Sequence, residues 1–261
     1  MKSCIRIVLL VFGLFLISFS PSNFIANDLK KIMIDIGHGG KDPGALGATK
    51  SFEKDIAFQI ATQLGSILQV HMPDVQYFYT RYNDDFVPVA ERARMANKQG
   101  VDFFMSIHTN ASTNPSIKGT ETYVMGLSVS QENMETAMRE NQAIKYENPR
   151  RRKEYPDFAS DEDIAFILTR IRQNNTHLKS IRAAELIEKY SQQRAINRQS
   201  LGVKSASFLV LYKSLMPSVL VETGYITNSE EEKYLQSEEG IHEVASYLYR
   251  ALRDYKAEIK K

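Results

Sequence analysis

Cysteine is nearly absent from this sequence. Its 261 residues include a single cysteine, Cys4, close to the N-terminal methionine. The rest of the chain therefore has no disulfide and no thiol nucleophile. A transition-metal site there must use histidine and carboxylate side chains, and a structural zinc domain, which usually closes four ligands with cysteines, is disfavoured.

A strong net charge is also lacking. The sequence has 33 Lys+Arg and 31 Asp+Glu, a formal net charge of +2. Two of the cations, Lys2 and Arg6, precede an apolar N-terminal run, and without them 33 − 2 = 31 cations balance the 31 anions. A near-neutral chain gives no reason to expect nucleic acid or an anionic membrane as a partner.

The one marked apolar run lies at the N-terminus and is short. It covers residues 7–17 (IVLLVFGLFLI), follows Lys2 and Arg6, and is followed by small and polar residues. This is the pattern of a secretory signal, whereas a membrane-spanning helix needs about 20 apolar residues. We expect a signal peptide over residues 1–26, with an uncleaved anchor as the alternative, no membrane span in the mature chain, and export across the inner membrane to the periplasm.

Three short apolar runs end in residues that can bind a metal. The run IMIDI leads to His38 among glycines, VDFFMSI leads to His108, and SVLV leads directly to Glu222. Such runs predict buried strands, and ligands bind at the carboxyl ends of strands in open α/β sheets. Two imidazoles and a carboxylate suit Zn²⁺, which in catalytic sites commonly has three protein ligands and an open position.

Structural readings of the same residues stay open. A single histidine at a strand end is commonly a core residue with a satisfied hydrogen bond. A further carboxylate, Glu53, opens a helical pattern with Ser51 as its expected N-cap, where a first-turn acid also complements the helix dipole. A purely structural role is the weakest interpretation for Glu222, because the apolar run directly before it is typical of a buried strand.

Hydrophobic patterning predicts the remaining elements. Strands are expected over residues 75–80, 119–126 and 207–212, helices over 89–98, 132–147, 160–172, 177–193, 230–236 and 240–255, and a basic exposed loop over 148–156. Strand-like runs that alternate with helical ones indicate an α/β fold. We expect a single domain over residues 27–261, with a twisted, mainly parallel sheet, helices on both faces and a helical insertion over about residues 128–200.

Six motifs occur in a fixed order along the chain. They are GHGGKDPGALG (37–47), Glu53-Lys54-Asp55, Thr80-Arg81, Glu91-Arg92 with Ala96-Asn97, SIHTNAS (106–112) and VETGYITN (221–228). Over residues 31–256, apart from an atypical central stretch, this sequence resembles the zinc-dependent N-acetylmuramoyl-L-alanine amidases of the amidase-3 type, which are bacterial cell-wall hydrolases.

The resemblance implies a metal, a reaction and roles for named residues. It assigns one Zn²⁺ per chain to His38, Glu53 and His108, and the role of general base to Glu222. The implied substrate is peptidoglycan, cut at the amide between N-acetylmuramic acid and L-alanine during wall remodelling or daughter-cell separation. The residues alone would stop at metal-assisted amide hydrolysis.

The resemblance also extends to regulation. Division-associated members carry an insertion whose helix covers the zinc with a glutamate, and Glu140 is the candidate here, with an activator protein as the partner that relieves the block. The plainer reading is a helical insertion packed on the sheet. Asn110 is a candidate for orienting the site, Arg81 and Arg92 are interpreted as ion-pair residues of a loop and a helix outside catalysis, and we expect a monomer.

Two other functions stay open from the sequence. A zinc carboxypeptidase or deacetylase would use the same ligands on another amide, and its digestion products would differ. A catalytically silent zinc- or glycan-binding regulator is a different class of protein, but it would have no need of Glu222.

Overall fold

The computed structural model describes residues 28–128, 130–153, 155, 175–193 and 199–260. The predicted signal peptide and the predicted helix over residues 160–172 lie outside these residues. Within the described part of the chain, no helix combines the length and the apolar character needed to cross a membrane.

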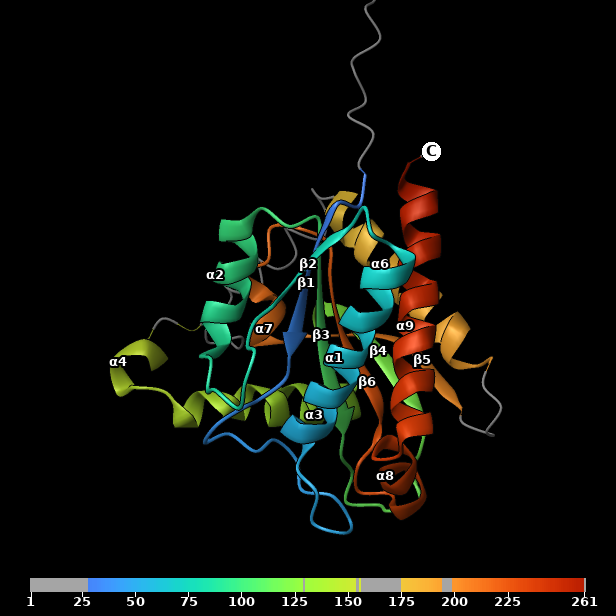
Figure 1. Ribbon diagram of the computed structural model, residues 1–261. Helices are drawn as coiled ribbons and strands as arrows, with labels where there is room; N and C mark the ends of the chain where they lie inside the picture. Colours follow the sequence, from blue (N-terminus) through green and yellow to red (C-terminus); the bar gives the residue numbers. More distant parts are fainter. Residues whose placement is uncertain (1–27, 129, 154, 156–174, 194–198, 261) are drawn as a thin grey trace, which may run out of the picture.

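A six-stranded sheet in the order β2-β1-β3-β6-β4-β5 forms the centre of the molecule (Figure 1). Its strands are β1 (Lys31–Ile36), β2 (Gln76–Tyr79), β3 (Phe103–Asn110), β4 (Thr120–Met125), β5 (Ser200–Ala206) and β6 (Ser218–Tyr225). All neighbouring pairs are parallel except β4 and β6. The prediction of a mainly parallel sheet is confirmed.

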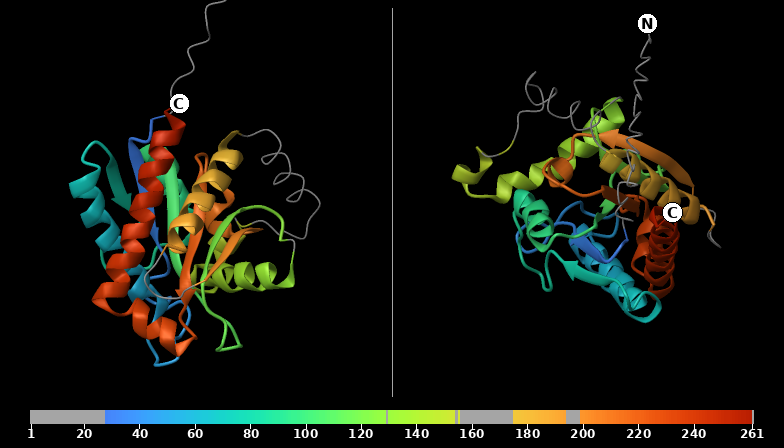
Figure 2. Two further views of the ribbon diagram at one scale, coloured as in Figure 1. Left: turned by 90° about the vertical axis from the view of Figure 1, so that its right-hand side faces the viewer. Right: turned by 90° about the horizontal axis from the view of Figure 1, so that it is seen from above.

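Helices cover both faces of this sheet (Figure 2). One face packs against α1 (Glu53–His71), α6 (Asn175–Ser191), α8 (Ser229–Leu235) and α9 (Glu238–Ile259), and the other against α2 (Val89–Gln99), α3 (Gln131–Asn141) and α7 (Leu209–Tyr212). A short 3₁₀ helix, η1 (Gln142–Tyr146), and α4 (Pro149–Arg152) follow α3. The prediction of an α/β fold with helices on both faces is therefore confirmed.

Alternation along the strands determines which side chains face α2 and α3. In β1, the apolar Ile32, Ile34 and Ile36 join the core beneath α1, while Met33 lies in the core on the α2 side. Because side chains alternate along a strand, Asp35 shares the face of Met33. The same rule places Ser106 and His108 of β3 on this face, and Glu222 pairs with His108 in the β3–β6 register.

Two local predictions are wrong. Residues 207–212 are not a strand: β5 ends at Ala206, and the apolar stretch that follows forms the short helix α7. A short, fully buried apolar run has no periodicity that separates the two structures. Ser51 is not the N-cap of α1, since Phe52 holds that position and the Ser51 hydroxyl donates to the Glu232 carboxylate at 2.5 Å.

The start of the predicted insertion lies across one end of the sheet. The helix expected over residues 132–147 is present as α3 followed by η1, and the expected basic loop contains the single turn α4. In Figure 1, α3 crosses the sheet at the end toward which the arrow of β1 points. It therefore lies at the carboxyl edge of the parallel strands, where the predicted site residues gather.

Candidate active site

Four buried side chains from four segments converge at the carboxyl edge of the sheet. His38 follows β1, Glu53 is the first residue of α1, His108 lies on β3 and Glu140 on α3. One nitrogen or oxygen atom from each lies within 4.8 Å of the other three, and all four residues are buried. Among the residues that the structure describes, this is the one such group of potential metal ligands. The structure thus brings the three predicted ligands together and adds Glu140.

Close packing of the loop after β1 fixes the orientation of the His38 ring. His38 itself has a left-handed backbone, with φ of 57°. A Cβ added to Gly44, whose φ is +70°, would lie 2.6 Å from both His38 Cδ2 and Glu53 Oε2. Real Cβ atoms do not approach that closely, so glycine is required there for the ring and the carboxylate to meet.

The Glu53 carboxylate is fixed by backbone donors. Its Oε2 accepts from the Ala45 amide at 2.8 Å and its Oε1 from the Thr109 amide at 3.0 Å. Its Oε2 lies 3.0 Å from His38 Nε2, and its Oε1 lies 3.0 Å from His108 Nδ1. Glu53 therefore does more than complement the dipole of α1: it joins the two imidazoles.

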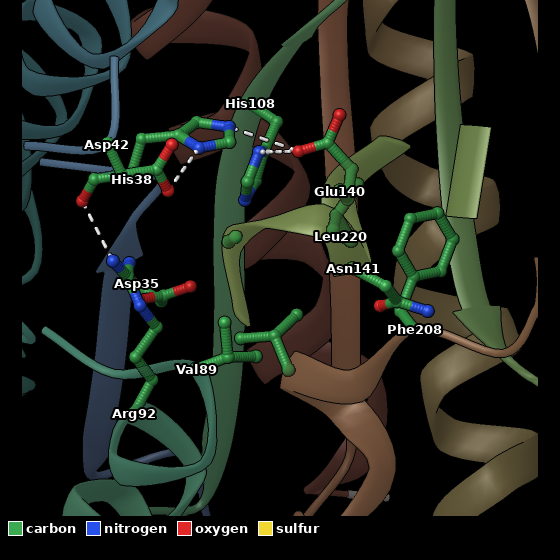
Figure 3. Close-up of a pocket in the computed structure, with 12 residues that line it drawn as sticks. Asp35, His38, Asp42, Val89, Arg92, His108, Glu140, Asn141, Phe208 and Leu220 are labelled. Atoms are coloured by element: carbon green, nitrogen blue, oxygen red, sulfur yellow. Dashed lines mark hydrogen bonds and ion pairs between the residues drawn. The ribbon is translucent and has the colours of Figure 1, made fainter. Parts of the chain in front are cut away.

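Glu140 closes the cluster from the side of α3. Its Oε2 lies 3.0 Å from His38 Nε2 and 3.0 Å from His108 Nδ1, and Figure 3 shows the carboxylate directed at both rings. The neighbouring Arg139 donates to the Ala111 carbonyl at 2.8 Å and to Asn110 Oδ1 at 2.7 Å. These bonds tie α3 to the end of β3. A cavity of about 20 Å³ remains beside the cluster, which is room for one or two waters and not for a saccharide.

The charges of the cluster are strongly coupled. Burial alone would lower the pKa of a histidine, but the Glu140 and Glu53 carboxylates raise the pKa of His108 to about 10. Burial alone would raise the pKa of a carboxyl, but His38 and His108 lower the pKa of Glu53 to about 2. The carboxylates therefore stay ionised and require positive charge between them.

Glu222 lies beside the cluster with its carboxylate unpaired by hydrogen bonds. It is fully buried, and neither oxygen has a hydrogen-bond partner in the structure. The nearest cation is Arg139, whose Nη2 is 3.6 Å from Glu222 Oε1. Burial and the charge of Glu140 raise the pKa of Glu222 well above its usual range. A carboxyl with a raised pKa holds a proton more readily than an exposed one, which suits a general acid/base.

Asn110, the residue expected to orient the site, binds polar residues next to the cluster. Its amide nitrogen donates to Glu121 Oε2 at 3.0 Å, and its Oδ1 accepts from Arg139. Glu121 also accepts from Tyr123, Tyr225 and Lys204, so it is the centre of a buried polar network next to Glu222. Asn110 thus positions Arg139 and has no hydrogen bond to the four-residue cluster.

The interpretation of Arg81 and Arg92 as surface residues is wrong, although Arg92 does form an ion pair, with Asp35 Oδ1 at 2.9 Å. Both are buried, at 3% exposure. Arg92 donates to the carbonyls of Ile36 (2.7 Å) and His38 (2.8 Å), and Arg81 donates to the Gly37 carbonyl at 3.1 Å. The carbonyls of this buried turn need donors, and a guanidinium supplies several in one plane. These two arginines therefore hold the backbone on either side of His38.

Three residues that sequence reasoning did not single out contact the two histidines or support them. Asp42 Oδ2 lies 2.9 Å from His38 Nδ1, Ser106 Oγ lies 3.1 Å from His108 Nε2, and Asp35 accepts from the Ser106 hydroxyl at 2.5 Å. Asp35 and Ser106 each interrupt an apolar run that predicts a buried strand. A polar residue inside such a run was the signal that could have identified them.

Sequence comparison finds a matching family and relatives with curated names. The family described as N-acetylmuramoyl-L-alanine amidase matches residues 32–254. The curated relative AmiA of Escherichia coli (strain K12), an N-acetylmuramoyl-L-alanine amidase, is 31% identical over 229 residues, which are 86% of this chain and 75% of AmiA.

Solved structures give the same answer for the fold. The amidase AmiC2 of Nostoc punctiforme is similar with a TM-score of 0.61 and 28% identity, over 87% of this chain and 96% of that one. An N-acetylmuramoyl-L-alanine amidase from Clostridium difficile 630 has a TM-score of 0.65 at 23% identity, over 87% of this chain and 97% of that one. At that identity, the second likeness concerns the fold alone.

Proposed function

Since the chain belongs to the N-acetylmuramoyl-L-alanine amidases, hydrolases that act on peptidoglycan, we propose that its buried cluster holds one Zn²⁺ and that it cuts the amide between N-acetylmuramic acid and L-alanine. His38, Glu53 and His108 are the proposed ligands, and Glu222 is the proposed general base. The observation that carries the proposal is the convergence of these ligands from three separate segments.

The donor set fits a zinc ion. The Asp42 carboxylate can only accept, so His38 donates its proton from Nδ1 and presents a bare Nε2 to the cluster. His38 Nε2 and Glu140 Oε2 are buried without a hydrogen-bond partner although they lie 3.0 Å apart. Two acceptors in such contact need a proton or a metal cation between them. Tetrahedral zinc with bonds of about 2.0–2.1 Å separates its donor atoms by roughly 3.3 Å, close to the spacing here.

The proposed mechanism assigns a proton-transfer role to Glu222. When bound, Zn²⁺ polarises the scissile carbonyl and makes a water acidic enough to lose a proton near neutral pH. Glu222 accepts that proton and delivers it to the leaving amide nitrogen of L-alanine. Its burial, its free oxygens and its raised pKa suit both steps. The arginine-bound turn at His38 and the backbone donors to Glu53 keep the ligands fixed during the reaction.

We further propose that this conformation is an inhibited one. Catalytic zinc sites keep an open position, whereas a fourth protein ligand closes the site. Glu140 occupies the place where that position is needed, and α3 leaves too little space for a glycan. An activator protein that displaces α3 would free the position. In this proposal the hydrogen bonds of Arg139 to Ala111 and Asn110 hold α3 on the end of β3.

The cellular setting follows from the substrate. We propose that residues 1–26 are a signal peptide and that residues 27–261 form the catalytic domain, which works on peptidoglycan in the periplasm. The amidase names of the relatives support this setting, because their substrate lies outside the inner membrane.

Digestion of peptidoglycan tests the proposed reaction. Purified chain is incubated with isolated peptidoglycan, with and without chelator, and the soluble products are identified by mass. We expect stem peptides that begin with L-alanine, released slowly by the parent chain and faster by Glu140→Ala, which lacks the blocking carboxylate. Products that result from cutting within the stem peptide would instead indicate a carboxypeptidase, and loss of acetyl groups would indicate a deacetylase.

A further inference from the structure

The second nitrogen of His108 is held by a relay of two buried residues. His108 Nε2 lies 3.1 Å from Ser106 Oγ, and the Ser106 hydroxyl lies 2.5 Å from Asp35 Oδ2. Asp35 and Ser106 are direct partners in the parallel β1–β3 register, and both are fully buried. The relay therefore runs across two neighbouring strands on the face that carries the cluster.

The direction of each hydrogen bond in this relay follows from the donors available. Asp35 also accepts from Thr80 Oγ1 at 2.7 Å and from Arg92 Nη1 at 2.9 Å, so it is an ionised carboxylate with no proton to give. The single proton of Ser106 must then go to Asp35. Ser106 can only accept from His108, which places one His108 proton on Nε2, so the proton that a bound cation would displace is the one on Nδ1, shared with Glu53 Oε1 at 3.0 Å.

The other ring nitrogen of His108, Nδ1, faces the cluster. His108 Nδ1 lies 3.0 Å from Glu53 Oε1 and 3.0 Å from Glu140 Oε2. His38 has the opposite arrangement, because Asp42 takes the proton of its Nδ1 and its Nε2 faces the cluster. The two histidines thus present different ring nitrogens to the same point.

We propose that Asp35 and Ser106 are positioning residues that fix His108 as the Nε2–H tautomer and so set the affinity of the cluster for zinc. This inference rests on the metal site proposed above. Hydrogen-bond partners of a metal-binding histidine set its tautomer and ring orientation, and their loss typically weakens metal binding about 10- to 100-fold.

Arg92 extends the relay to the other histidine. Its Nη1 binds Asp35 at 2.9 Å, while its Nη2 binds the His38 carbonyl at 2.8 Å. One guanidinium therefore fixes the backbone of one proposed ligand and, through Asp35 and Ser106, the ring of the other. This arrangement explains why the charged Asp35 lies among the apolar residues that follow Lys31 in β1.

Zinc affinity of matched variants tests the relay. Competition with a chromophoric chelator gives the dissociation constant for Zn²⁺ in the full chain, in Ser106→Ala and in Ser106→Thr, which keeps the hydroxyl. We expect Ser106→Ala to bind zinc about 10- to 100-fold more weakly and Ser106→Thr to recover most of the affinity. An affinity of folded Ser106→Ala within about twofold of the parent chain would overturn the proposal.

A serine outside the site provides the control. Ser191 on α6 is also buried, at 2% exposure, and its hydroxyl donates to the Glu188 carboxylate at 3.4 Å. Ser191→Ala should lower stability without a change in zinc affinity. If Ser191→Ala weakened zinc binding as much as Ser106→Ala does, loss of any buried hydroxyl would explain the result and the relay would be refuted.

Spectroscopy of the unaltered chain tests the tautomer without a variant. The full chain is labelled with ¹⁵N-histidine and loaded with ¹¹³Cd²⁺. We expect two of the five histidines to show one-bond coupling to cadmium, one through Nδ1 and the other through Nε2. Coupling of both through Nε2 would overturn the relay while the metal site stands. Absence of any coupled histidine would remove the metal site itself, and the relay with it.

Discussion

Replacement of Glu140 by alanine tests the proposed closed state of the enzyme. The Glu140 carboxylate of α3 contacts both imidazoles at 3.0 Å, and its removal leaves the three proposed zinc ligands in place. The value for hydrogen bonds to charged groups, about 1.5–3 kcal/mol, serves as the order of magnitude for loss of this buried charged contact. Because 1.4 kcal/mol is a factor of ten, we expect Glu140→Ala to raise the population of the open state, and hence the basal rate, about 10- to 150-fold.

The assay is release of peptides that begin with L-alanine from peptidoglycan, at equal zinc content, measured without an activator. Glu135→Ala provides the control, because Glu135 is an exposed glutamate on the same helix. It should leave the rate unchanged. A rate for zinc-loaded Glu140→Ala equal to that of the parent chain would refute the reasoning that Glu140 blocks the site.

Three further predictions concern the base, the cluster and the loop. Glu222→Gln should keep zinc and lose about 10²–10⁴-fold in turnover; zinc retention with full turnover would mean that another group is the base. Folding raises the pKa of His108 from 6.5 to about 10. In metal-free protein, kept so by chelator, the charge of His108 therefore adds fully to the free energy of unfolding below pH 6.5, and this contribution is lost as pH rises toward 10. Urea unfolding at pH 6 and pH 9 checks this: equal stabilities in chelator would contradict it. Gly44→Ala should lose zinc, measured by metal analysis of the folded protein, because the new Cβ meets His38 and Glu53 at 2.6 Å; normal zinc content would show that the loop can adjust.

The sheet and the gathering of the site residues were predictable from the sequence. His38, His108 and Glu222 each follow or end a run that reads as a buried strand, and the carboxyl ends of parallel strands meet at one edge. The local apolar pattern and this general rule were therefore sufficient to predict that the three residues lie at one edge of the sheet. The pairing of Glu53 with the two histidines required the family motif, because a first-turn glutamate is common on any helix.

The supporting residues could not be predicted in the same way. Arg92 is separated from its partner Asp35 by 57 positions, and nothing in a helix that carries several charges tells which arginine is buried. The role of Ser106 depends on the register between β1 and β3, which fixes Asp35 as its neighbour. Such contacts arise from tertiary packing, and short-range pattern carries no information on them.

Glu140 and α7 also show that local sequence pattern does not reveal contacts between distant segments. Glu140 was named through a family resemblance, since the residues around it read as an ordinary surface helix. Residues 207–212 were misassigned because apolar and β-branched composition favours a strand, whereas the Asn141 side chain caps Leu209 and starts a helical turn. In both cases the deciding contact joins segments about 30 to 100 positions apart.

The most direct test of the central claim combines metal and product in one measurement. Glu140→Ala, stripped of metal, is titrated with Zn²⁺ in the presence of peptidoglycan, and bound zinc and released peptides are quantified together. We expect peptides that begin with L-alanine to appear in proportion to bound zinc, up to one zinc per chain. Release that is complete in metal-free protein, or zinc binding at one per chain with no such peptide, would contradict a zinc amidase at this site.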